Sequence, residues 1–164
     1  MMRYCLFPTP LGWMGLLGSE AGIRRVILPK PSPQDVLRLL SHSLRGAKED
    51  ASPFGDLPQR LSRYLEGERV SLADPLDLEG TTPFQQEVWA QTRLIPPGQT
   101  RSYGWVARRM GRPRAVRAVG GALARNPVPL LIPCHRVVRS DGGLGGYGGG
   151  LEMKRRLLQI EGSV

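Results

Sequence analysis

A cysteine and a histidine stand side by side at Cys134 and His135, directly after the apolar run LLIP. A thiolate is a strong nucleophile and a neutral imidazole can take up its proton, so this pair can do nucleophilic chemistry. A free cysteine is more often a small buried apolar side chain, and Cys5 in MMRYCLF fits that description. Cys134 fits it less well, because Pro133 interrupts the strand pattern and polar residues follow. The sequence therefore places Cys134 where a reactive group would lie.

The cysteine and histidine residues, which are the usual zinc ligands, are few and lack the spacing of a zinc site. The cysteines and histidines are Cys5, His42, Cys134 and His135, without a CxxC or HxxxH pair. Zinc sites use closely spaced ligand pairs, so we expect no metal and no cofactor. We also expect no disulfide between the two cysteines in a reducing compartment.

The chain of 164 residues shows neither a signal-peptide pattern nor an apolar run near the roughly 18 residues that span a bilayer. We therefore expect a soluble, cytoplasmic protein with no membrane partner.

The net charge of +9 is concentrated in the second half of the chain. Residues 1–78 hold 10 basic and 9 acidic side chains, whereas residues 79–164 hold 13 and 5. This asymmetry indicates that the second half meets a polyanion such as nucleic acid. A basic solvated face is the alternative that charge alone leaves open.

The first half of the chain predicts strands followed by helices. Strands are expected at residues 3–7, 13–17 and 23–28, separated by turn residues. Helices are expected at residues 32–44, with Ser32 as the N-cap and Pro33 at the first helical position, and at residues 56–67. This α/β unit carries no motif for chemistry.

A connector at residues 71–80 separates this unit from a different second half. We place the boundary near Gly80, with domains at residues 1–79 and 80–164. A helix is expected at residues 81–94, opened by a capping box of Thr82 and Gln85.

Two further helices predict a helix-turn-helix, one between Ser102 and Gly111 and one starting at Pro113. The second contains RAVGGALA, whose small residues fill a core poorly. A tightly packed helix pair would explain them. The alternative, which the charge favours, is close approach to DNA with polar contacts from Arg114, Arg117 and Arg125.

The segment IPCHRVV, preceded by RAVGGALARNPVP and followed by GGYGGGLEMKRRLLQIEG, resembles the O6-alkylguanine-DNA alkyltransferase family. The match spans residues 81–162. The resemblance implies a two-domain α/β (α+β) fold, with an N-terminal ribonuclease-H-like domain and a C-terminal winged-helix domain that binds DNA.

The resemblance also implies the reaction. A damaged guanine is flipped out of double-stranded DNA, and its O6-alkyl group passes irreversibly to Cys134, so each chain reacts once. Whether O4-alkylthymine is also a substrate stays open. No protein partner is implied, and the chain is expected to be a monomer.

The family relay falls on Cys134, His135 and Glu161. His135 would take the thiol proton through water, and Glu161 would orient the imidazole. A Cys–His–acid set also serves cysteine hydrolases, in which water releases an acyl thioester. A small-molecule hydrolase has no need for the basic helix-turn-helix, which favours the transferase.

Three residues match positions that act on the DNA or brace the site. Tyr103 would rotate the nucleotide out and donate to guanine N3, and Arg117 would fill the gap in the base stack. Asn126 would brace the turn between the recognition helix and the active-site strand. An ordinary half-buried aromatic and an ordinary turn asparagine are the structural alternatives for Tyr103 and Asn126.

The pocket residues follow from the same resemblance. The backbone carbonyls of Cys134 and Val137 would accept from the guanine amino group. Tyr147, Gly148 and Gly149 would wall the pocket.

In that wall, the Gly148 N–H would meet O6, and Pro129 would offer an apolar surface opposite. Many relatives carry serine at position 148, so glycine there puts the order of this loop in doubt. A DNA-binding damage sensor or transcriptional regulator is the rival that is not an enzyme, and the presence of Cys134 argues against it.

Overall fold

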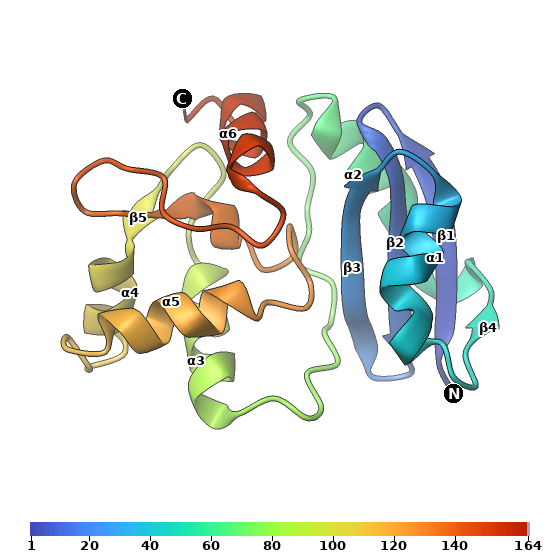
Figure 1. Ribbon diagram of the computed structural model, residues 1–164, viewed down its shortest axis with the longest axis horizontal. Helices are drawn as coiled ribbons and strands as arrows, with labels where there is room; N and C mark the ends of the chain where they lie inside the picture. Colours follow the sequence, from blue (N-terminus) through green and yellow to red (C-terminus); the bar gives the residue numbers. More distant parts are fainter. Residues whose placement is uncertain (164) are drawn as a thin grey trace. The chain divides into compact units, whose positions relative to one another are not determined.

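Three strands at the start of the chain form an antiparallel meander. In the computed structural model, which describes residues 1–163, these are β1 (Arg3–Thr9), β2 (Gly12–Ser19) and β3 (Gly22–Lys30). A short strand, β4 (Lys48–Glu49), pairs parallel with β1 and completes the order β3-β2-β1-β4 (Figure 1). The sequence predicts the first three strands but not β4, because two exposed charged residues carry no strand pattern.

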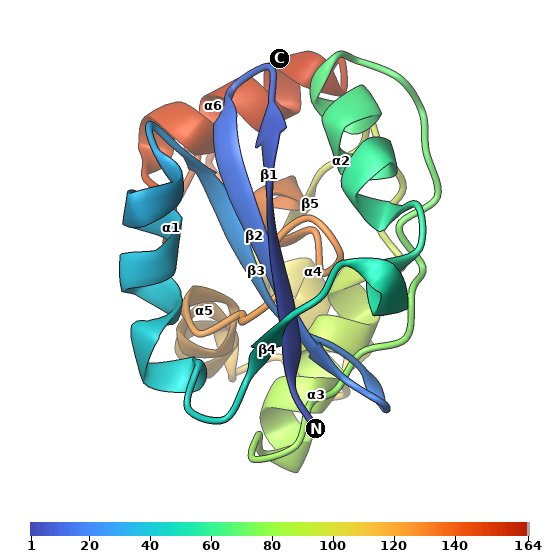
Figure 2. The same ribbon diagram turned by 90° about the vertical axis from the view of Figure 1, so that its right-hand side faces the viewer.

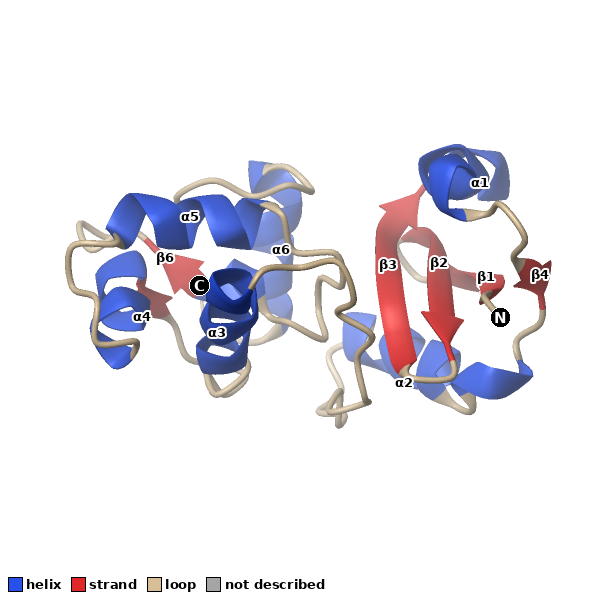
Figure 3. Ribbon diagram, turned by 90° about the horizontal axis from the view of Figure 1, so that it is seen from below, coloured by secondary structure: helices blue, strands red, loops and turns tan. Residues whose placement is uncertain are grey.

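Helices cover both faces of this sheet. Figures 2 and 3 show α1 (Pro33–Leu40) and α2 (Leu57–Leu65) on opposite sides of the strands. The middle strand β2 is accordingly buried from Met14 to Gly18. A Cβ atom at Gly15 would lie 2.5 Å from a Val36 methyl carbon, so α1 packs directly on the strand.

The first helix begins as predicted and ends earlier. The Ser32 hydroxyl accepts a hydrogen bond from the Asp35 N–H at 3.2 Å, and Pro33 opens the helix. The expected extent to residue 44 is wrong, because α1 ends at Leu40 and a 3-10 turn, η1 (Ser41–Ser43), follows. The Ser41 hydroxyl donates back to the Arg38 carbonyl at 2.8 Å, a local bond that competes with helix continuation.

The chain divides into two compact units, Met1–Leu78 and a second that starts at Glu79, close to the boundary expected near Gly80. In the second unit, α3 (Pro83–Thr92) carries the expected capping box between Thr82 and Gln85. Helices α4 (Tyr103–Arg109) and α5 (Val116–Ala124) pack against each other and against α3.

The expected start of α5 at Pro113 is wrong. The Ala115 N–H donates to the Arg112 carbonyl at 2.9 Å, which makes residues 112–115 a turn with proline at its second position. Proline suits that position as well as the first turn of a helix, so the sequence signal is ambiguous.

Two short parallel strands, β5 (Arg101–Ser102) and β6 (Val137–Val138), and a last helix, α6 (Leu151–Ile160), complete the unit. The buried Trp89 of α3 donates its indole N–H to the Ala122 carbonyl of α5 at 3.0 Å. Helix α3 thereby holds α5, which in turn positions the segment that carries Cys134. No helix among residues 1–163 is long and apolar enough to cross a membrane.

Candidate active site

Cys134 opens a 3-10 turn, η3 (Cys134–Arg136), between a buried apolar segment and β6. The thiol-bearing residue is 8% exposed. Just before it, Leu130 has a φ of 76°, the left-handed region that a branched side chain rarely adopts. The backbone bends sharply here, with the Ile132 N–H donating to the Val128 carbonyl at 3.0 Å.

Asn126 connects this bend to the thiol. Its Nδ2 donates to the Ile132 carbonyl at 2.8 Å and to the Cys134 Sγ at 3.1 Å. Its Oδ1 accepts from the Val128 N–H at 2.9 Å. One side chain thus braces the turn and contacts the sulfur directly.

Behind the cysteine lies a buried charged cluster. His135 Nε2 lies 2.9 Å from Glu161 Oε2, and neither residue is more than 4% exposed. The Arg136 guanidinium donates to both oxygens of the same carboxylate, from Nε at 2.9 Å and from a terminal nitrogen at 2.7 Å. Its other terminal nitrogen donates to the Ile95 carbonyl at 2.7 Å. The carboxylate is therefore held by a base and by a permanent cation.

Burial sets the protonation of the two reactive groups in opposite directions. It raises the pKa of the Cys134 thiol, while the Asn126 amide and the Lys154 ammonium oppose that rise. Burial lowers the pKa of His135, and the Glu161 carboxylate opposes that fall. The imidazole is therefore neutral near pH 7, the form that can accept a proton from a thiol.

A pocket of about 900 Å³ opens beside Cys134. Its walls come from the start of α4, one face of α5, the segment between β6 and α6, and the first half of α6. The lining residues are Tyr103, Val116, Gly120, Leu123, Ala124, Cys134, Arg139, Gly143, Leu144, Gly145, Gly146, Tyr147, Gly148, Leu151 and Arg155. Three leucines and two tyrosines beside a thiol make a site for a flat, partly apolar group.

Tyr103 is fitted tightly against one wall of this pocket. Gly145 has a φ of 74°, and a Cβ atom there would lie 2.5 Å from the Tyr103 hydroxyl. Glycine is thus required at position 145 both by the backbone and by the tyrosine. Burial raises the pKa of Tyr103, so its hydroxyl remains a donor at neutral pH.

Two family models match the chain. The ribonuclease-like domain of 6-O-methylguanine DNA methyltransferase matches residues 2–78, and the DNA-binding domain of the same family matches residues 83–163. The methylated-DNA–protein-cysteine methyltransferase of Methanosarcina acetivorans is 37% identical over 171 residues, covering 99% of each chain. The chain belongs to the 6-O-methylguanine DNA methyltransferase family.

Solved structures in the methyltransferase family are similar over nearly the whole chain. A crystal structure of Mycobacterium tuberculosis OGT in complex with DNA has a TM-score of 0.81 and 37% identity, covering 98% of this chain and 93% of that one. The O6-methylguanine-DNA methyltransferase of Pyrococcus kodakaraensis has a TM-score of 0.75 and 28% identity, covering 99% of each chain. The family and the two-domain fold predicted from the sequence are therefore confirmed.

The structure brings most, but not all, of the expected methyltransferase residues to the pocket. Tyr147 and Gly148 line it with Cys134 and Tyr103, but Pro129 and Gly149 are not among the described residues that form its walls. The Val137 carbonyl already accepts a hydrogen bond from Lys154 at 2.7 Å.

The three arginines expected to meet DNA are all exposed. Arg117 lies on α5, whereas Arg114 lies in the turn before this helix and Arg125 directly after it. The terminal nitrogen of Arg125 donates to the Gly121 carbonyl at 3.3 Å.

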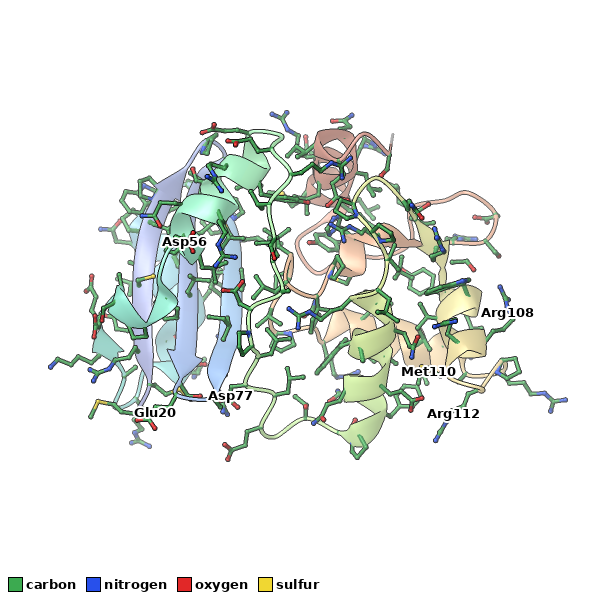
Figure 4. The ribbon with its side chains drawn as sticks, turned by 180° about the vertical axis from the view of Figure 1, so that it is seen from behind. Glu20, Asp56, Asp77, Arg108, Met110 and Arg112 are labelled. Atoms are coloured by element: carbon green, nitrogen blue, oxygen red, sulfur yellow. The ribbon has the colours of Figure 1, made fainter. Side chains whose placement is uncertain are left out.

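Basic side chains extend beyond these three along the DNA-binding domain. Arg108 of α4 and Arg112 of the turn before α5 point outward (Figure 4). Arg101 and Arg109 lie 5.5 and 5.6 Å from the ring centre of Trp105, which orients both guanidinium groups. Much of the excess positive charge in the second half of the sequence thus lies on exposed side chains around the helix-turn-helix.

Sequence reasoning misses Arg136 and Lys154 as parts of the site. The helical spacing of Lys154 to Leu157 and Leu158 is the signal that could have placed it on a buried face. Among the described residues, no group of three His, Cys, Asp or Glu side chains is arranged to hold a metal ion.

Proposed function

We propose that this protein repairs DNA directly, by moving the alkyl group of an O6-alkylguanine in double-stranded DNA onto the sulfur of Cys134. The observation that carries the proposal is the position of Cys134 beside a pocket of about 900 Å³, with Asn126 on its sulfur and the buried His135–Glu161 pair behind it. A nucleophile, a base and an orienting carboxylate are thus held together next to space for a base.

The relay produces the thiolate that the reaction needs. With Nε2 of His135 facing Glu161, Nδ1 is the ring nitrogen that accepts the thiol proton, through water. Glu161 stabilises the imidazolium that forms, and Arg136 fixes the carboxylate in place.

The transfer step is a displacement at a saturated carbon. The sulfur forms a bond to the alkyl carbon while the bond from that carbon to guanine O6 breaks, and the electron pair goes to the guanine. A proton then restores the neutral base. The product is a thioether, which water does not cleave, so the protein is consumed in one turnover.

Access to the pocket requires the nucleotide to leave the duplex, which costs a few kcal/mol for a paired base. The Tyr103 side chain crowds the phosphate of the target nucleotide and its hydroxyl donates to guanine N3. Arg117 enters the vacated space in the stack, and Arg114 and Arg125 contact phosphates.

The flipped guanine is recognised mainly by backbone groups. The carbonyls of Cys134 and Val137 accept from its amino group, and the N–H of Gly148 donates to O6. A carbonyl has two acceptor sites, so Val137 can serve both Lys154 and the base. Tyr147 and Gly149 complete the wall, and Pro129 supports it from outside the lining.

The chemistry in this scheme belongs to the C-terminal domain, residues 80–164, whereas the N-terminal domain, residues 1–79, supplies none of the named groups. The protein acts as a monomer in the cytoplasm, without a cofactor. Its membership of the family argues against both the cysteine hydrolase and the regulator that only binds DNA.

Incubation with a duplex that carries radiolabelled O6-methylguanine tests the proposal. Label should move from DNA to protein and reach at most one methyl group per chain. Binding of the methylated duplex with all label left on the DNA would contradict it and favour a damage sensor.

A further inference from the structure

The residues that line the pocket beside Cys134 differ widely in exposure. Cys134 is 8% exposed, whereas Val116 of α5 and Leu151 of α6 line the same pocket and are 40% and 52% exposed. The sulfur therefore lies at the closed end of the pocket, and the two apolar side chains lie at its open end. An alkyl group must reach the sulfur, so the open end receives another part of the nucleotide.

Arginine supplies the charge of this lining. Among the described residues that form the walls, the charged ones are Arg139 and Arg155, and no carboxylate accompanies them. The Arg139 guanidinium is paired, because it donates to the Asp141 carboxylate at 2.8 Å. The Arg155 guanidinium is exposed and makes no hydrogen bond or ion pair with the part of the chain that the structure describes. Arg155 thus adds an uncompensated positive charge to the pocket wall.

Helix α6 places this charge next to an apolar side chain. Leu151 and Arg155 are four residues apart, so they are neighbours on one face of the helix, and both line the pocket. Arg156, the next residue, is also exposed but is not among the lining residues. The face that borders the pocket therefore offers an apolar contact and a cation, one helical turn apart.

A flipped base alone does not account for this cation. Guanine with an uncharged alkyl group carries no charge, so it gains little from an arginine on the pocket wall. The phosphates that join the nucleotide to its strand are anionic, and they remain at the open end when the base enters. A guanidinium matches phosphate oxygens with two parallel N–H bonds. The chemistry of Arg155 thus fits the backbone of the flipped nucleotide.

We propose that Arg155 binds a phosphate of the flipped nucleotide, with Leu151 against its sugar, and so holds the nucleotide in its rotated position. The inference rests on the proposed function, because it requires a nucleotide in the pocket. The contact differs from those of Arg114 and Arg125, which meet phosphates of the duplex around the helix-turn-helix. Arg155 favours only a substrate that carries a phosphate on the flipped nucleoside itself.

Two small substrates that differ only in their phosphates test this contact. The rate of Cys134 alkylation is measured by intact mass with O6-benzyl-2′-deoxyguanosine and with its 3′,5′-bisphosphate, and the readout is the ratio of the two rates. At low salt the unaltered protein should react roughly three- to tenfold faster with the bisphosphate, the scale of a charge-assisted contact weakened by exposure to water. Added salt should reduce this ratio, because exposed charges are screened. The two monophosphates then identify the phosphate that is bound.

Substitutions on α6 separate this contact from the general attraction of a basic protein for an anion. Arg155→Met should lose most of the ratio, and Arg155→Lys should keep part of it, because an ammonium binds phosphate without the paired geometry. Arg156→Met removes the same charge from the same helix outside the lining, so it is the matched control and should keep the ratio. All three variants change exposed side chains, and thermal melting checks that they fold.

The outcomes distinguish this inference from the proposed function. A ratio that is the same in Arg155→Met, in Arg156→Met and in the unaltered protein would overturn the role of Arg155 and assign the attraction to the overall charge of the domain. Benzyl transfer from the nucleoside with no gain from the phosphates would overturn that role alone. Failure to take the benzyl group from either the nucleoside or free O6-benzylguanine would refute the proposed function, and this inference with it.

Discussion

The side-chain amide of Asn126 donates a hydrogen bond to the thiol of Cys134, with 3.1 Å between Nδ2 and Sγ. This bond favours the thiolate and opposes the effect of burial on the pKa of Cys134. The same amide group fixes the turn through Ile132 and Val128. Asn126 therefore both braces the turn and favours the thiolate form of Cys134.

Asn126→Asp should change the chemistry of the thiol and weaken only part of the brace. The aspartate keeps an acceptor for the Val128 N–H but loses the donor to the Ile132 carbonyl, and it replaces the donor beside the sulfur with a negative charge, which disfavours the thiolate. We expect the pKa of Cys134 to rise and transfer to slow most at low pH, where the thiolate is scarcest. Asn126→Ala should additionally destabilise the fold by about 1–3 kcal/mol, since buried partners lose their bonds. The pH dependence of Cys134 alkylation and thermal melting measure the two effects, and an aspartate variant as fast as the unaltered protein would remove Asn126 from the chemistry.

Cys134→Ala should abolish transfer and leave binding to alkylated duplex DNA largely intact. Affinity arises from phosphate contacts and from the base pocket, neither of which needs the sulfur. Label transfer and a gel-shift titration on the same duplex measure the two properties. Cys5 is the only other thiol, and burial raises its pKa to about 12, so Cys5→Ala is the matched control and should transfer normally. Residual transfer by Cys134→Ala would place the nucleophile elsewhere.

His135→Ala should slow transfer more at low pH than at high pH. Thiolate formation depends on the imidazole near neutrality, whereas hydroxide can remove the proton at high pH. In the unaltered protein, which retains His135, the free energy of unfolding should also fall as the pH is lowered. Because burial lowers the pKa of His135 from 6.5, the unfolded chain takes up a proton first as the pH falls below that value. Rates and denaturant unfolding across this range give both measurements, and a loss of rate that is independent of pH would indicate a structural role only.

Arg117→Ala should slow repair of duplex DNA and leave the reaction with free O6-benzylguanine almost unchanged. Only the duplex substrate must be unstacked, and the Arg117 side chain is exposed and lies outside the pocket lining. Parallel rate measurements on the two substrates make the comparison, with Arg108→Ala as a control for the general loss of one positive charge. Equal losses on both substrates would mean that Arg117 supports the pocket itself.

Some parts of the site could be predicted from local chain geometry, and others, such as Glu161 and Tyr103, only from the resemblance to the family. Cys134, His135 and the bend before them lie within one short segment, and the capping box of Thr82 and Gln85 is a contact between neighbours in sequence. The burial of Arg136 and Lys154 could not be predicted, because charged side chains are expected at the surface when only the sequence is known. Their burial depends on partners that the tertiary fold supplies, such as the Glu161 carboxylate and the Val137 carbonyl.

Strands β4, β5 and β6 were beyond prediction for a related reason. Each contains two residues, so no alternation of apolar and polar positions can develop. Their pairing is decided by the partner strand, as in the parallel contact of Arg101 with Val137. The proline at position 113 shows the opposite difficulty, a signal that is strong but compatible with both a turn and a helix start.

The size of the accepted alkyl group follows from the wall opposite Cys134. The pocket of about 900 Å³ exceeds what a methylated guanine fills, and Gly148 lines it without a side chain. A benzyl group should therefore fit, and its benzylic carbon is more reactive in displacement than a methyl group. O6-benzylguanine as a free base should accordingly form a single benzyl adduct on Cys134, detected by mass spectrometry of the intact protein and its peptides.

Gly148→Val should narrow this pocket selectively. A Cβ atom at position 148 would have only the Ala124 carbonyl oxygen within 4.0 Å, so the backbone accepts a side chain there without a clash. The added methyl groups enter the space that a benzyl group needs and leave the position of a methyl group free, so benzyl transfer should fall at least about tenfold relative to methyl transfer. Gly121→Ala, on α5 but outside the lining, is the matched control for free-base reactions, because its Cβ would make only an ordinary contact at 3.5 Å. A protein that repairs methylated duplex DNA but forms no benzyl adduct would show that the glycine-rich loop is not ordered around the base. In that case, the free-energy cost of ordering the loop would cancel the gain from the larger pocket.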